Sequence, residues 1–401
     1  MTSPSPSPCP RSRWLIKLLV ILVLIGACLL LVLFIYTQLF RYLLRGGGMP
    51  RTELSAAVCL VPVKRRVSSA ASASMHGMYN PTAVQLKDSS FLVGYRLCTF
   101  HTGNAYLDIA LSGGHSNRFL VRKCASKPPF DVFNASTDDV RAAARLVTSS
   151  GGADRTVEDV RLLMFRGEVW GVGTVTLMEH NGKHHPVLLR FQLGRGNGSS
   201  QPLPVASGQP PLLQMIYCNG FTNYDTSLMH KNWIGMQHGS GDLLVHRDTY
   251  PELVVSRVRD PGGENRLEPL VRVDSLPALR SLITKDVRCI RNTSNWISWD
   301  ADTWAFLAHT KVQPGIVMLY RTALVLVCKK TFAVVNHTPW LNLDAANEEG
   351  HGGAPIQFAS FLWRDSKLVY IGMGLNDSAT CFQSFRASDI DRLLLLSNKQ
   401  K

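Results

Sequence analysis

Residues 157–177 read VEDVRLLMFRGEVWGVGTVTL and contain the local pattern that decides the fold. A polar group leads into a short apolar segment, which is followed by a turn at Phe165-Arg166-Gly167 and by a second apolar segment. Apolar runs of this length, alternating or bounded by Gly, Asp, Asn or Ser, are typical of β-strands joined by tight turns. We therefore expect this region to form a hairpin in a β-sheet.

The same pattern of a turn followed by a strand recurs along the chain. Copies begin near Phe91, Val169 and Leu243, about 75 residues apart. The interval from there to Leu368 is longer than one such step and must contain a further copy. Repetition at this scale in an all-β chain indicates propeller blades, and an array of β-sandwiches is the alternative.

Composition excludes several classes of protein. The chain has 401 residues, of which 45% are hydrophobic and 18% charged, so it is not disordered throughout. Its 31 Gly and 21 Pro have no three-residue period, which excludes collagen and suits a turn-rich β protein. Helical patterns are scarce: the candidates are Thr137–Val147 and Ser388–Leu396, the latter with Ser388 as its N-cap.

One segment near the N-terminus is apolar enough to cross a membrane. Residues 18–36, LLVILVLIGACLLLVLFIY, carry no charge, and the uncharged stretch continues to Phe40. A bilayer requires about 20 apolar residues, so the sequence predicts a single transmembrane helix and excludes a multi-span transporter. A cleaved signal peptide is the alternative, but its apolar core is usually shorter.

Possible glycosylation sites suggest the orientation, because basic residues flank the apolar segment almost equally on both sides. Five Asn-x-Ser/Thr sequons follow the segment, at Asn134, Asn197, Asn292, Asn336 and Asn376. They favour a lumenal C-terminal region. We therefore expect a type II protein of the Golgi membrane with a cytoplasmic tail (1–14), an anchor (15–40), a stem (41–76) and a β-propeller (77–401).

Charge and cysteine content suggest the compartment and the partners. The net charge of +14 favours anionic ligands such as nucleotide-sugars, while the anchor and the lack of a nucleic-acid-binding motif argue against nucleic acid. The nine cysteines include no CxxC pair, which argues against a structural zinc site. Seven of them follow the anchor, and an oxidising lumen would allow six of these to pair.

Four polar segments lie beside predicted strands and are candidates for the chemistry of the protein. They are Asn80-Pro81-Thr82-Ala83 with Arg96 in the next strand, Glu158-Asp159-Val160-Arg161, His230-Lys231-Asn232-Trp233, and His351-Gly352-Gly353-Ala354-Pro355. Each also has a purely structural interpretation. Residues 80–81 and 352–353 suit ordinary turns, residues 158–161 a solvated turn with a local ion pair, and residues 231–233 a packed tryptophan with a polar rim.

In this order the four segments resemble the motifs of the five-bladed β-propeller family of inverting β-mannoside phosphorylases and its protozoan branch of β-1,2-mannosyltransferases. Family members read approximately Asn-Pro-x-(Ala/Val) with a following strand Arg, then Glu-Asp-Pro-Arg, Glu-Lys-Asn-Trp and Arg-Gly-Gly-x-Pro. The resemblance covers about residues 77–385. Val160, His230 and His351 depart from the family pattern, so the resemblance does not identify the donor sugar. The fold that the resemblance implies is an all-β, five-bladed propeller.

The resemblance also implies roles for individual residues. Asp159 would be the catalytic acid/base, because glycosyl transfer needs a carboxyl group beside the anomeric centre. Glu158 and Arg161 would flank it, with Arg161 bonding the sugar and holding Asp159 in place, and Asn80 would bind sugar hydroxyls at the propeller axis.

Phosphate and sugar contacts would come from the remaining motif positions. Arg96 and Lys231 are the residues that we expect to meet phosphate, because positive charge suits its oxygens. Trp233 is a candidate for stacking on a sugar face, and Asn232 would orient it.

A rival site is the pair Asp300 and Asp302, because two carboxylates can hold a divalent metal against the diphosphate of a nucleotide-sugar. That motif normally belongs to an α/β fold, and the chain shows no βαβ alternation, so we predict no metal site and no required cofactor. Trp296, Trp299 and Trp304 are instead candidates for an aromatic, sugar-facing surface.

Together these features predict a type II, inverting glycosyltransferase of the secretory pathway. The donor would be a nucleotide-sugar, such as GDP-mannose or a donor of arabinose, and the acceptor a glycan or phosphoglycan. The alternatives are a β-mannoside phosphorylase or hydrolase, and a propeller that binds glycans without catalysis.

Overall fold

The computed structural model describes residues 20–26, 28–32, 57–60, 62–67, 76–99, 118–130, 157–177, 183–193, 213–226, 231–284, 287, 289–312, 319–343, 357–375 and 379–398. The chain divides into two compact units, Met1–Ser55 and Ala56–Lys401.

The first unit contains part of the predicted anchor. Residues 20–26 and 28–32 are helical, and nearly all of their side chains are exposed. None of the helices among the described residues is both long and apolar enough to cross a membrane. The rest of the predicted anchor, residues 15–19, 27 and 33–40, lies outside the described residues.

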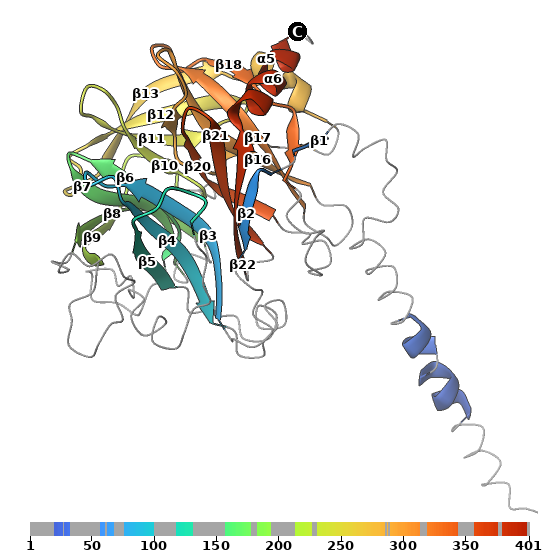
Figure 1. Cartoon of the computed structure of the whole chain (residues 1–401). Helices are drawn as coiled ribbons and strands as arrows, with labels where there is room; N and C mark the ends of the chain where they lie inside the picture. Colours follow the sequence, from blue (N-terminus) through green and yellow to red (C-terminus); the bar gives the residue numbers. More distant parts are fainter. Residues whose placement is uncertain are drawn as a thin grey trace, which may run out of the picture. The chain divides into compact units, whose positions relative to one another are not determined.

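The second unit is all-β, and its described strands form five separate sheets, which are the blades of a β-propeller (Figure 1). Blade 1 contains β3 (His76–Gln85), β4 (Phe91–Thr99) and β5 (Arg118–Cys124). Blade 2 contains β6 (Val157–Phe165), β7 (Glu168–Leu177), β8 (Lys183–Leu193) and β9 (Leu213–Gly220). Blade 3 contains β10 (Ile234–Gln237), β11 (Leu243–Asp248), β12 (Glu252–Arg259) and β13 (Arg266–Asp274).

The last two blades complete the ring. Blade 4 contains β14 (Arg291–Asn292), β15 (Ile297–Ser298), β16 (Thr303–Val312), β17 (Leu319–Cys328), β18 (Val334–His337) and β19 (Trp340–Asn342). Blade 5 contains β20 (Gln357–Arg364), β21 (Leu368–Leu375) and β22 (Ala379–Arg386). The first strands of neighbouring blades contact one another, β3 with β6 and β20 and β6 with β10, as strands around a common axis must. The predicted five-bladed propeller is confirmed, and the sandwich alternative is wrong.

The repeat seen in the sequence corresponds to the second strand of each blade. The three copies near Phe91, Val169 and Leu243 are β4, β7 and β11, and the copy near Leu368 is β21. The further copy expected between the last two is β16, which begins at Thr303. These strands pair with neighbouring strands on both edges, and most of their residues are buried.

Two strands near the start of the second unit join the last two blades. β1 (Ala57–Cys59) pairs in parallel with β19 of blade 4. β2 (Lys64–Val67) pairs antiparallel with β22 of blade 5, from Lys64 opposite Ser384 to Val67 opposite Cys381. The range predicted as a stem, residues 41–76, therefore contains two strands of the propeller. The boundary predicted at residue 77 is too late, because the compact unit begins at Ala56.

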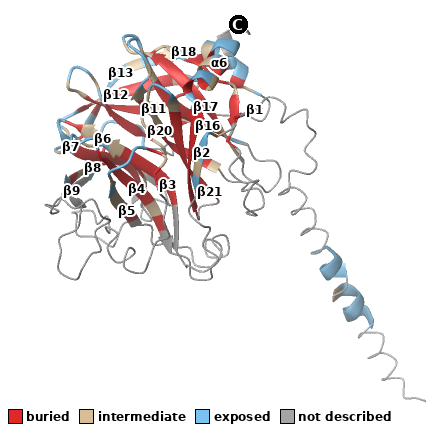
Figure 2. Cartoon of the chain, in the orientation of Figure 1, coloured by how far each residue is buried: buried red, intermediate tan, exposed pale blue. Residues whose placement is uncertain are grey.

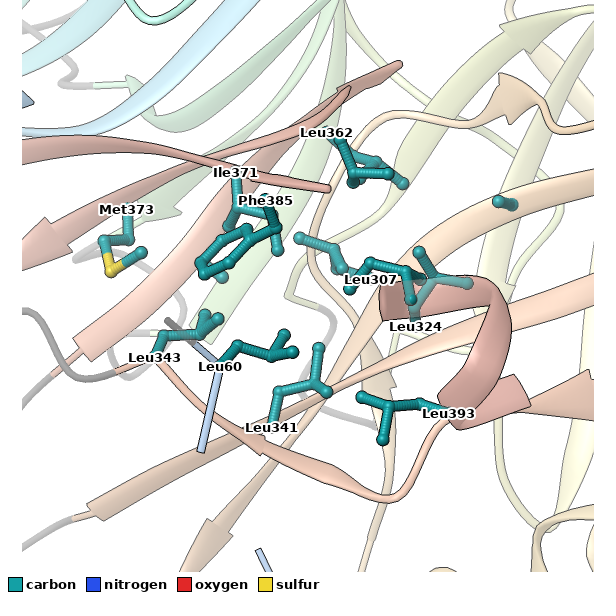
Figure 3. Close-up of a cluster of buried hydrophobic side chains, with 14 of the residues drawn as sticks. Leu60, Leu307, Leu324, Leu341, Leu343, Leu362, Ile371, Met373, Phe385 and Leu393 are labelled. Carbon is teal, nitrogen blue, oxygen red and sulfur yellow. The ribbon is translucent and has the colours of Figure 1, made fainter. Parts of the chain in front are cut away.

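Hydrophobic side chains fill the space between blades, and the buried residues follow the strands (Figure 2). The cluster between blades 4 and 5 joins Leu307 and Leu324 to Ile371 and Phe385, and Leu60, which directly follows β1, lies in the same cluster (Figure 3). The N-terminal strands are thus held by packing as well as by backbone hydrogen bonds.

Helices are few among the described residues of this unit. α6 (Ala387–Asn398) confirms the helix predicted over Ser388–Leu396, and its Leu393 packs into the cluster of Figure 3. It begins one residue earlier than predicted, so Ser388 lies inside the helix rather than at its N-cap. The short helices α5 (Leu276–Leu279) and η2 (Arg280–Leu282) follow β13, and the helix predicted over 137–147 lies outside the described residues.

Small polar side chains link the blades near the axis. Each of four hydrogen bonds joins two different blades: Leu162 N to Thr82 Oγ1 at 2.9 Å, Ser360 Oγ to Pro81 O at 2.7 Å, Thr293 Oγ1 to Ala359 O at 2.6 Å, and Asn292 Nδ2 to His246 O at 2.9 Å. A net contribution of about 1 kcal/mol is typical of such a bond. Their larger effect is to fix the inner strands relative to one another, which is the frame on which the site is built.

Two of the predicted glycosylation sites are not available in this fold. Asn292 is fully buried, and its Nδ2 donates to His246 O. Asn336 is also buried, and its Nδ2 donates to Leu394 O at 3.1 Å. A glycan on either amide has no room, so these two predictions are wrong. Asn134, Asn197 and Asn376 lie outside the described residues.

The cysteines do not form the three disulfides that seven of them would allow. Cys289 and Cys328, on either side of β16 in blade 4, are both free thiols. At most four of the other five can pair, so the six paired cysteines that an oxidising lumen would allow are not present in this structure.

Candidate functional site

Three of the predicted site residues occupy comparable places at the inner edges of blades 1, 2 and 3. Asn80 in β3, Asp159 in β6 and Asn232 just before β10 all have a left-handed backbone, with φ of 50°, 52° and 63°. This conformation costs most side chains about 1–2 kcal/mol, and Asn and Asp tolerate it best. Strain of this kind is concentrated at functional sites.

β-bulges explain the first two of these conformations. The pairing of β3 with β4 shifts register between Tyr79 and Thr82, and that of β6 with β7 shifts between Glu158 and Arg161. A bulge leaves an extra residue outside the ladder and redirects its side chain.

The two redirected side chains meet across the boundary between blades 1 and 2. Asn80 Nδ2 donates a hydrogen bond of 2.7 Å to Asp159 Oδ1. Because a carboxylate only accepts, this bond also fixes the orientation of the Asn80 amide. The structure therefore brings together the first two predicted motifs.

Arg96, Glu158 and Lys231 extend this contact into a network of charges. Arg96 Nη1 lies 3.4 Å from Asp159 Oδ1, and its Nη2 lies 3.2 Å from Glu158 Oε1. Lys231 Nζ lies 3.8 Å from Glu158 Oε2. The Asp159 side chain keeps 13% of its surface exposed and Lys231 keeps 31%, so the network is accessible from one side.

Asp159 is ionised in this setting. Burial raises its pKa, but the charges of Arg96 and Arg161, the hydrogen bond from Asn80 and the charge of Lys231 outweigh burial and lower the pKa from 3.8 to about 2. A carboxylate in this state can accept a proton, but it has none to donate.

Arg161 is buried beside Asp159 and makes its hydrogen bonds to backbone carbonyls. It is only 1% exposed, its Nε donates to Thr293 O of blade 4 at 3.0 Å, and its Nη1 donates to Val160 O at 3.4 Å. Its guanidinium lies over the ring of Phe358 in blade 5, 5.8 Å from the centroid. Arg161 thus spans the axis from blade 2 and acts on Asp159 through its charge, with no direct hydrogen bond.

Trp233 packs in the core, as its structural interpretation predicted. It is 3% exposed and lies against Phe221 and Tyr224, with ring centroids 5.6 and 5.2 Å away. The guanidinium of Arg247 covers it at 4.9 Å. No open face is left in this structure for the stacking on sugar that we expected, so this prediction is wrong here. Asn232, its neighbour, is half-buried beside Lys231.

A buried histidine that the sequence did not indicate, His309 of β16, lies near Arg161. It is buried and packs against Phe358 and Tyr320, with ring centroids 5.0 and 5.6 Å away. Burial, together with the nearby charges of Arg291 and Arg161, lowers its pKa to about 3, so the imidazole is neutral. Its segment, AFLAHTKV, reads as an ordinary strand, and only the folded structure brings it near Arg161.

The rival acidic pair forms a turn. Asp300 Oδ1 accepts hydrogen bonds from the backbone N–H groups of Asp302 at 2.9 Å and Thr303 at 2.7 Å, between β15 and β16. Asp302 is exposed. Within the described part of the chain, no three or more His, Cys, Asp or Glu side chains are grouped to hold a metal ion.

The three tryptophans around this turn do not form one surface. Trp296 is buried, stacks on Phe306 with ring centroids 5.0 Å apart, and donates its Nε1–H to His246 Nδ1 at 3.1 Å. The prediction that it faces a sugar is therefore wrong. Trp299 and Trp304 are half-buried and pack beside two different hydrophobic clusters. His230 and residues 351–355 of the fourth motif lie outside the described residues.

Comparison with known proteins yields matches among solved structures alone. Neither a protein-family model nor a curated protein matches the sequence. A mannose phosphorylase from Leishmania mexicana, in complex with phosphate, is 10% identical with a TM-score of 0.50, over 82% of this chain and 89% of that one. A β-1,2-mannobiose phosphorylase from Listeria innocua is 10% identical with a TM-score of 0.50, over 84% and 95% of the two chains.

A third match is a GDP-Man-dependent mannosyltransferase from Leishmania mexicana, 10% identical with a TM-score of 0.47, over 84% of this chain and 93% of that one. At such low identity, the two matches with a TM-score of 0.50 establish the fold alone. The resemblance to the family of five-bladed β-mannoside phosphorylases and mannosyltransferases is thus confirmed at the level of architecture.

Proposed function

We propose that this propeller, whose fold is that of the β-mannoside phosphorylases and Leishmania mannosyltransferases, is an inverting glycosyltransferase with Asp159 as its general base. The observation that carries the proposal is the ionised Asp159, held by Asn80 and Arg96 and partly open to solvent. A base in the deprotonated state is what transfer to an acceptor hydroxyl requires.

The proposed reaction uses one carboxylate and one displacement. An acceptor hydroxyl loses its proton to Asp159, directly or through a hydroxyl of the sugar, while its oxygen attacks the anomeric carbon of the donor. The bond from that carbon to the phosphate oxygen breaks on the opposite face, and its electron pair leaves with the nucleoside diphosphate. A single displacement inverts the anomeric configuration.

The charge network supports the choice of a phosphate-bearing donor. Lys231 approaches one oxygen of Glu158 at 3.8 Å and is nearly one-third exposed, so its ammonium is available to a ligand. Arg96 is shared between Glu158 and Asp159. We therefore assign Lys231 to the leaving diphosphate and Arg96 to holding the base in place. The solved structures suggest mannose as the transferred sugar. Because Val160, His230 and His351 differ from the family motifs, donors of a pentose such as arabinose are also tested.

A phosphorylase is the second candidate, because two of the matched structures are phosphorylases. Cleavage of a β-mannoside by phosphate runs the displacement in reverse, so Asp159 would have to donate a proton to the leaving oxygen. The low pKa of Asp159 opposes this role.

A donor screen tests the proposal. The fragment from residue 50 onward is incubated with each nucleotide-sugar and mixed glycan acceptors, with and without EDTA. We expect transfer that survives EDTA and is lost, by a factor of about 10² or more, in Asp159→Asn. The matched control is Asp88→Asn: Asp88 also has a pKa of about 2, through Lys123 and Ser90, but lies in the turn between β3 and β4.

Other outcomes identify the alternatives. Cleavage of β-mannosides that depends on inorganic phosphate would replace the transferase with a phosphorylase. Binding of glycans by both the wild type and Asp159→Asn, with no turnover on any donor, would make the protein a binding module. Transfer that is lost with EDTA and kept by Asp159→Asn would move the chemistry to Asp300 and Asp302.

We also propose that the enzyme acts in the Golgi lumen as a type II membrane protein. The support is the uncharged stretch from residue 18 to Phe40 and the three sequons at Asn134, Asn197 and Asn376. Treatment of the protein from secretory cells with an N-glycosidase should increase its gel mobility. Unchanged mobility would contradict the lumenal orientation.

A further inference from the structure

Two buried histidines of this propeller differ in the hydrogen bonding of their ring nitrogens. His246 in β11 and His309 in β16 are both neutral, each with its pKa lowered to about 3, mainly by burial. His246 uses both ring nitrogens: Nδ1 accepts from Trp296, and Nε2 bonds to Asp248 O at 3.0 Å. His309 Nδ1 is buried and has no hydrogen-bond partner among the described residues. A buried ring nitrogen without a partner is costly, which suggests a missing ligand.

Two further buried atoms near Asp159 share this property. Asn80 Oδ1 and Arg161 Nη2 also have no hydrogen-bond partner in the described part of the chain. The three side chains are 7%, 1% and 6% exposed, in the order Asn80, Arg161 and His309. Leaving three such groups unpaired at one place is unusual, because buried polar groups in folded proteins are nearly always satisfied.

Contacts and charges link these three groups to Asp159. Asn80 bonds directly to Asp159. Arg161 and His309 pack against the same ring, Phe358, and the charges of both Arg161 and Asp159 influence the pKa of His309. Blades 1, 2 and 4 thus each contribute one unsatisfied polar atom, and Phe358 of blade 5 packs against two of the three side chains.

The chemistry of the three atoms selects the ligand. Asn80 Oδ1 is an acceptor and requires a donor from the ligand, whereas Arg161 Nη2 is a donor and requires an acceptor. Inorganic phosphate offers acceptors and would face the carboxylate of Asp159. A hydroxyl group both donates and accepts, so sugar hydroxyls have the chemistry to satisfy all three atoms.

We propose that His309 is a sugar-binding residue, whose neutral imidazole hydrogen-bonds a hydroxyl of the sugar held beside Asp159, together with Asn80 Oδ1 and Arg161 Nη2. The inference rests on the proposed function in taking a sugar as the ligand, and it adds a residue of blade 4 to the residues of blades 1, 2 and 3 that surround Asp159 in the proposed site. It requires binding only, so it can be tested without turnover.

The first experiment observes the imidazole directly. The propeller from residue 50 onward, labelled with ¹⁵N-histidine, is titrated with mannose, arabinose, β-1,2-mannobiose and inorganic phosphate in separate runs. We expect the ring signals of His309, assigned by loss in His309→Leu, to shift with at least one sugar. The fully bonded His246 is the internal control and should not move. His309 signals that move with phosphate alone, or with none of the four probes, overturn the proposal.

The second experiment separates binding from structure. His309→Leu removes the unpaired nitrogen from an apolar setting, so the melting temperature of the free protein should stay equal or rise. The dissociation constant for the sugar that shifts His309 should increase by about tenfold or more, and His309→Gln should restore part of the affinity. A lower melting temperature with unchanged affinity shows a structural role and overturns the proposal.

Different results would contradict the proposed transferase activity and the proposed sugar binding by His309. A sugar that shifts His309 without turnover on any donor would contradict the transferase and leave the binding residue in place. Transfer activity that is unchanged in His309→Leu, with an unmoved His309 signal, would contradict the binding residue and leave the transferase in place.

Discussion

At the scale of single residues, the site depends on how Asp159 is charged. One oxygen of this carboxylate receives both the Asn80 amide and the Arg96 guanidinium, and Arg161 and Lys231 add positive charge at longer range. Bonds to ionised groups are stronger than those between neutral groups. The same interactions that place the carboxylate therefore also set its protonation state.

The pH dependence of transfer follows from the lowered pKa of Asp159. Since its pKa is about 2 in the folded protein, Asp159 remains ionised down to that pH, and loss of activity between pH 7 and 4 should not come from its protonation. Initial rates of transfer against pH, for the wild type, check this. Activity that rises as the pH falls, as a protonated acid would require, contradicts the assignment of Asp159 as the base.

Stability should depend on pH through the same group. A carboxylate whose pKa is lower in the folded than in the unfolded state stabilises the fold above the unfolded value and loses this contribution as the pH falls through the folded value. For Asp159 this amounts to about 2 kcal/mol at neutral pH, lost between about pH 4 and pH 2. Urea unfolding of the wild type and Asp159→Asn at pH 7 and pH 3 measures it, and the difference between the two proteins should shrink at the lower pH.

At the scale of elements, the bulge in β3 depends on a glycine in β21. A β-carbon placed on Gly374 would lie 2.6 Å from Asn80 Oδ1 and 2.9 Å from the Asn80 backbone nitrogen. Contacts under 3.0 Å force one of the two strands to move. Gly374 thus lets blade 5 approach the point in blade 1 where the chain turns left-handed.

Substitution of this glycine should displace Asn80 from Asp159. We expect Gly374→Ala to lower transfer activity by about tenfold or more and the free energy of unfolding by about 1–3 kcal/mol, because the added methyl group overpacks the contact. Gly239→Ala is the matched control, since nothing lies within 4 Å of the β-carbon at that position. Equal activity of the two variants would show that the close approach of β21 has no part in positioning Asn80.

The strands show which elements can be predicted from sequence. β4, β7, β11 and β21 have apolar runs bounded by turn residues, so pattern alone located them. β1 and β2 have three and four residues in a segment rich in Ser and Ala, and only their pairing with β19 and β22 makes them strands. Short edge strands carry little periodic signal.

The residues of the candidate site also divide into those that the sequence indicates and those that only the folded structure reveals. Asn80, Glu158 and Asp159 lie in contiguous motifs, and the structure joins them to Arg96 and Lys231, which we expected to meet phosphate. His309 is recognisable only after folding, because the residues around it come from other blades. The burial of Trp296 was equally hidden, and that of Trp233 was one of two interpretations, since an aromatic residue at a strand end suits either a core or a binding surface.

At the scale of the whole molecule, residues 57–67 close the ring. β1 adds a strand to blade 4 and β2 adds one to blade 5, with Leu60 packed in the cluster between the two blades. These residues are distant in sequence from every strand that they contact.

A truncation tests this closure. A fragment that begins at residue 77 lacks both strands and leaves β22 with an unpaired edge and the cluster without Leu60. We expect it to be insoluble or to melt at least about 10 °C below the fragment that begins at residue 50. Thermal melting followed by circular dichroism compares the two. Equal melting temperatures would show that residues 57–67 are an appendage to the propeller.

The pairing of β2 with β22 also governs the timing of folding during synthesis. Ser384 Oγ contacts Lys64 O across 320 residues of sequence. At translation rates of about 5–20 residues per second, β2 waits roughly 16 to 64 seconds before the strand that pairs with it leaves the ribosome. During that interval blade 5 does not exist, and blade 1 has no neighbour on one side. Until the last blade has been made, the side chains of the first blade that pack against it in the folded protein have no partner.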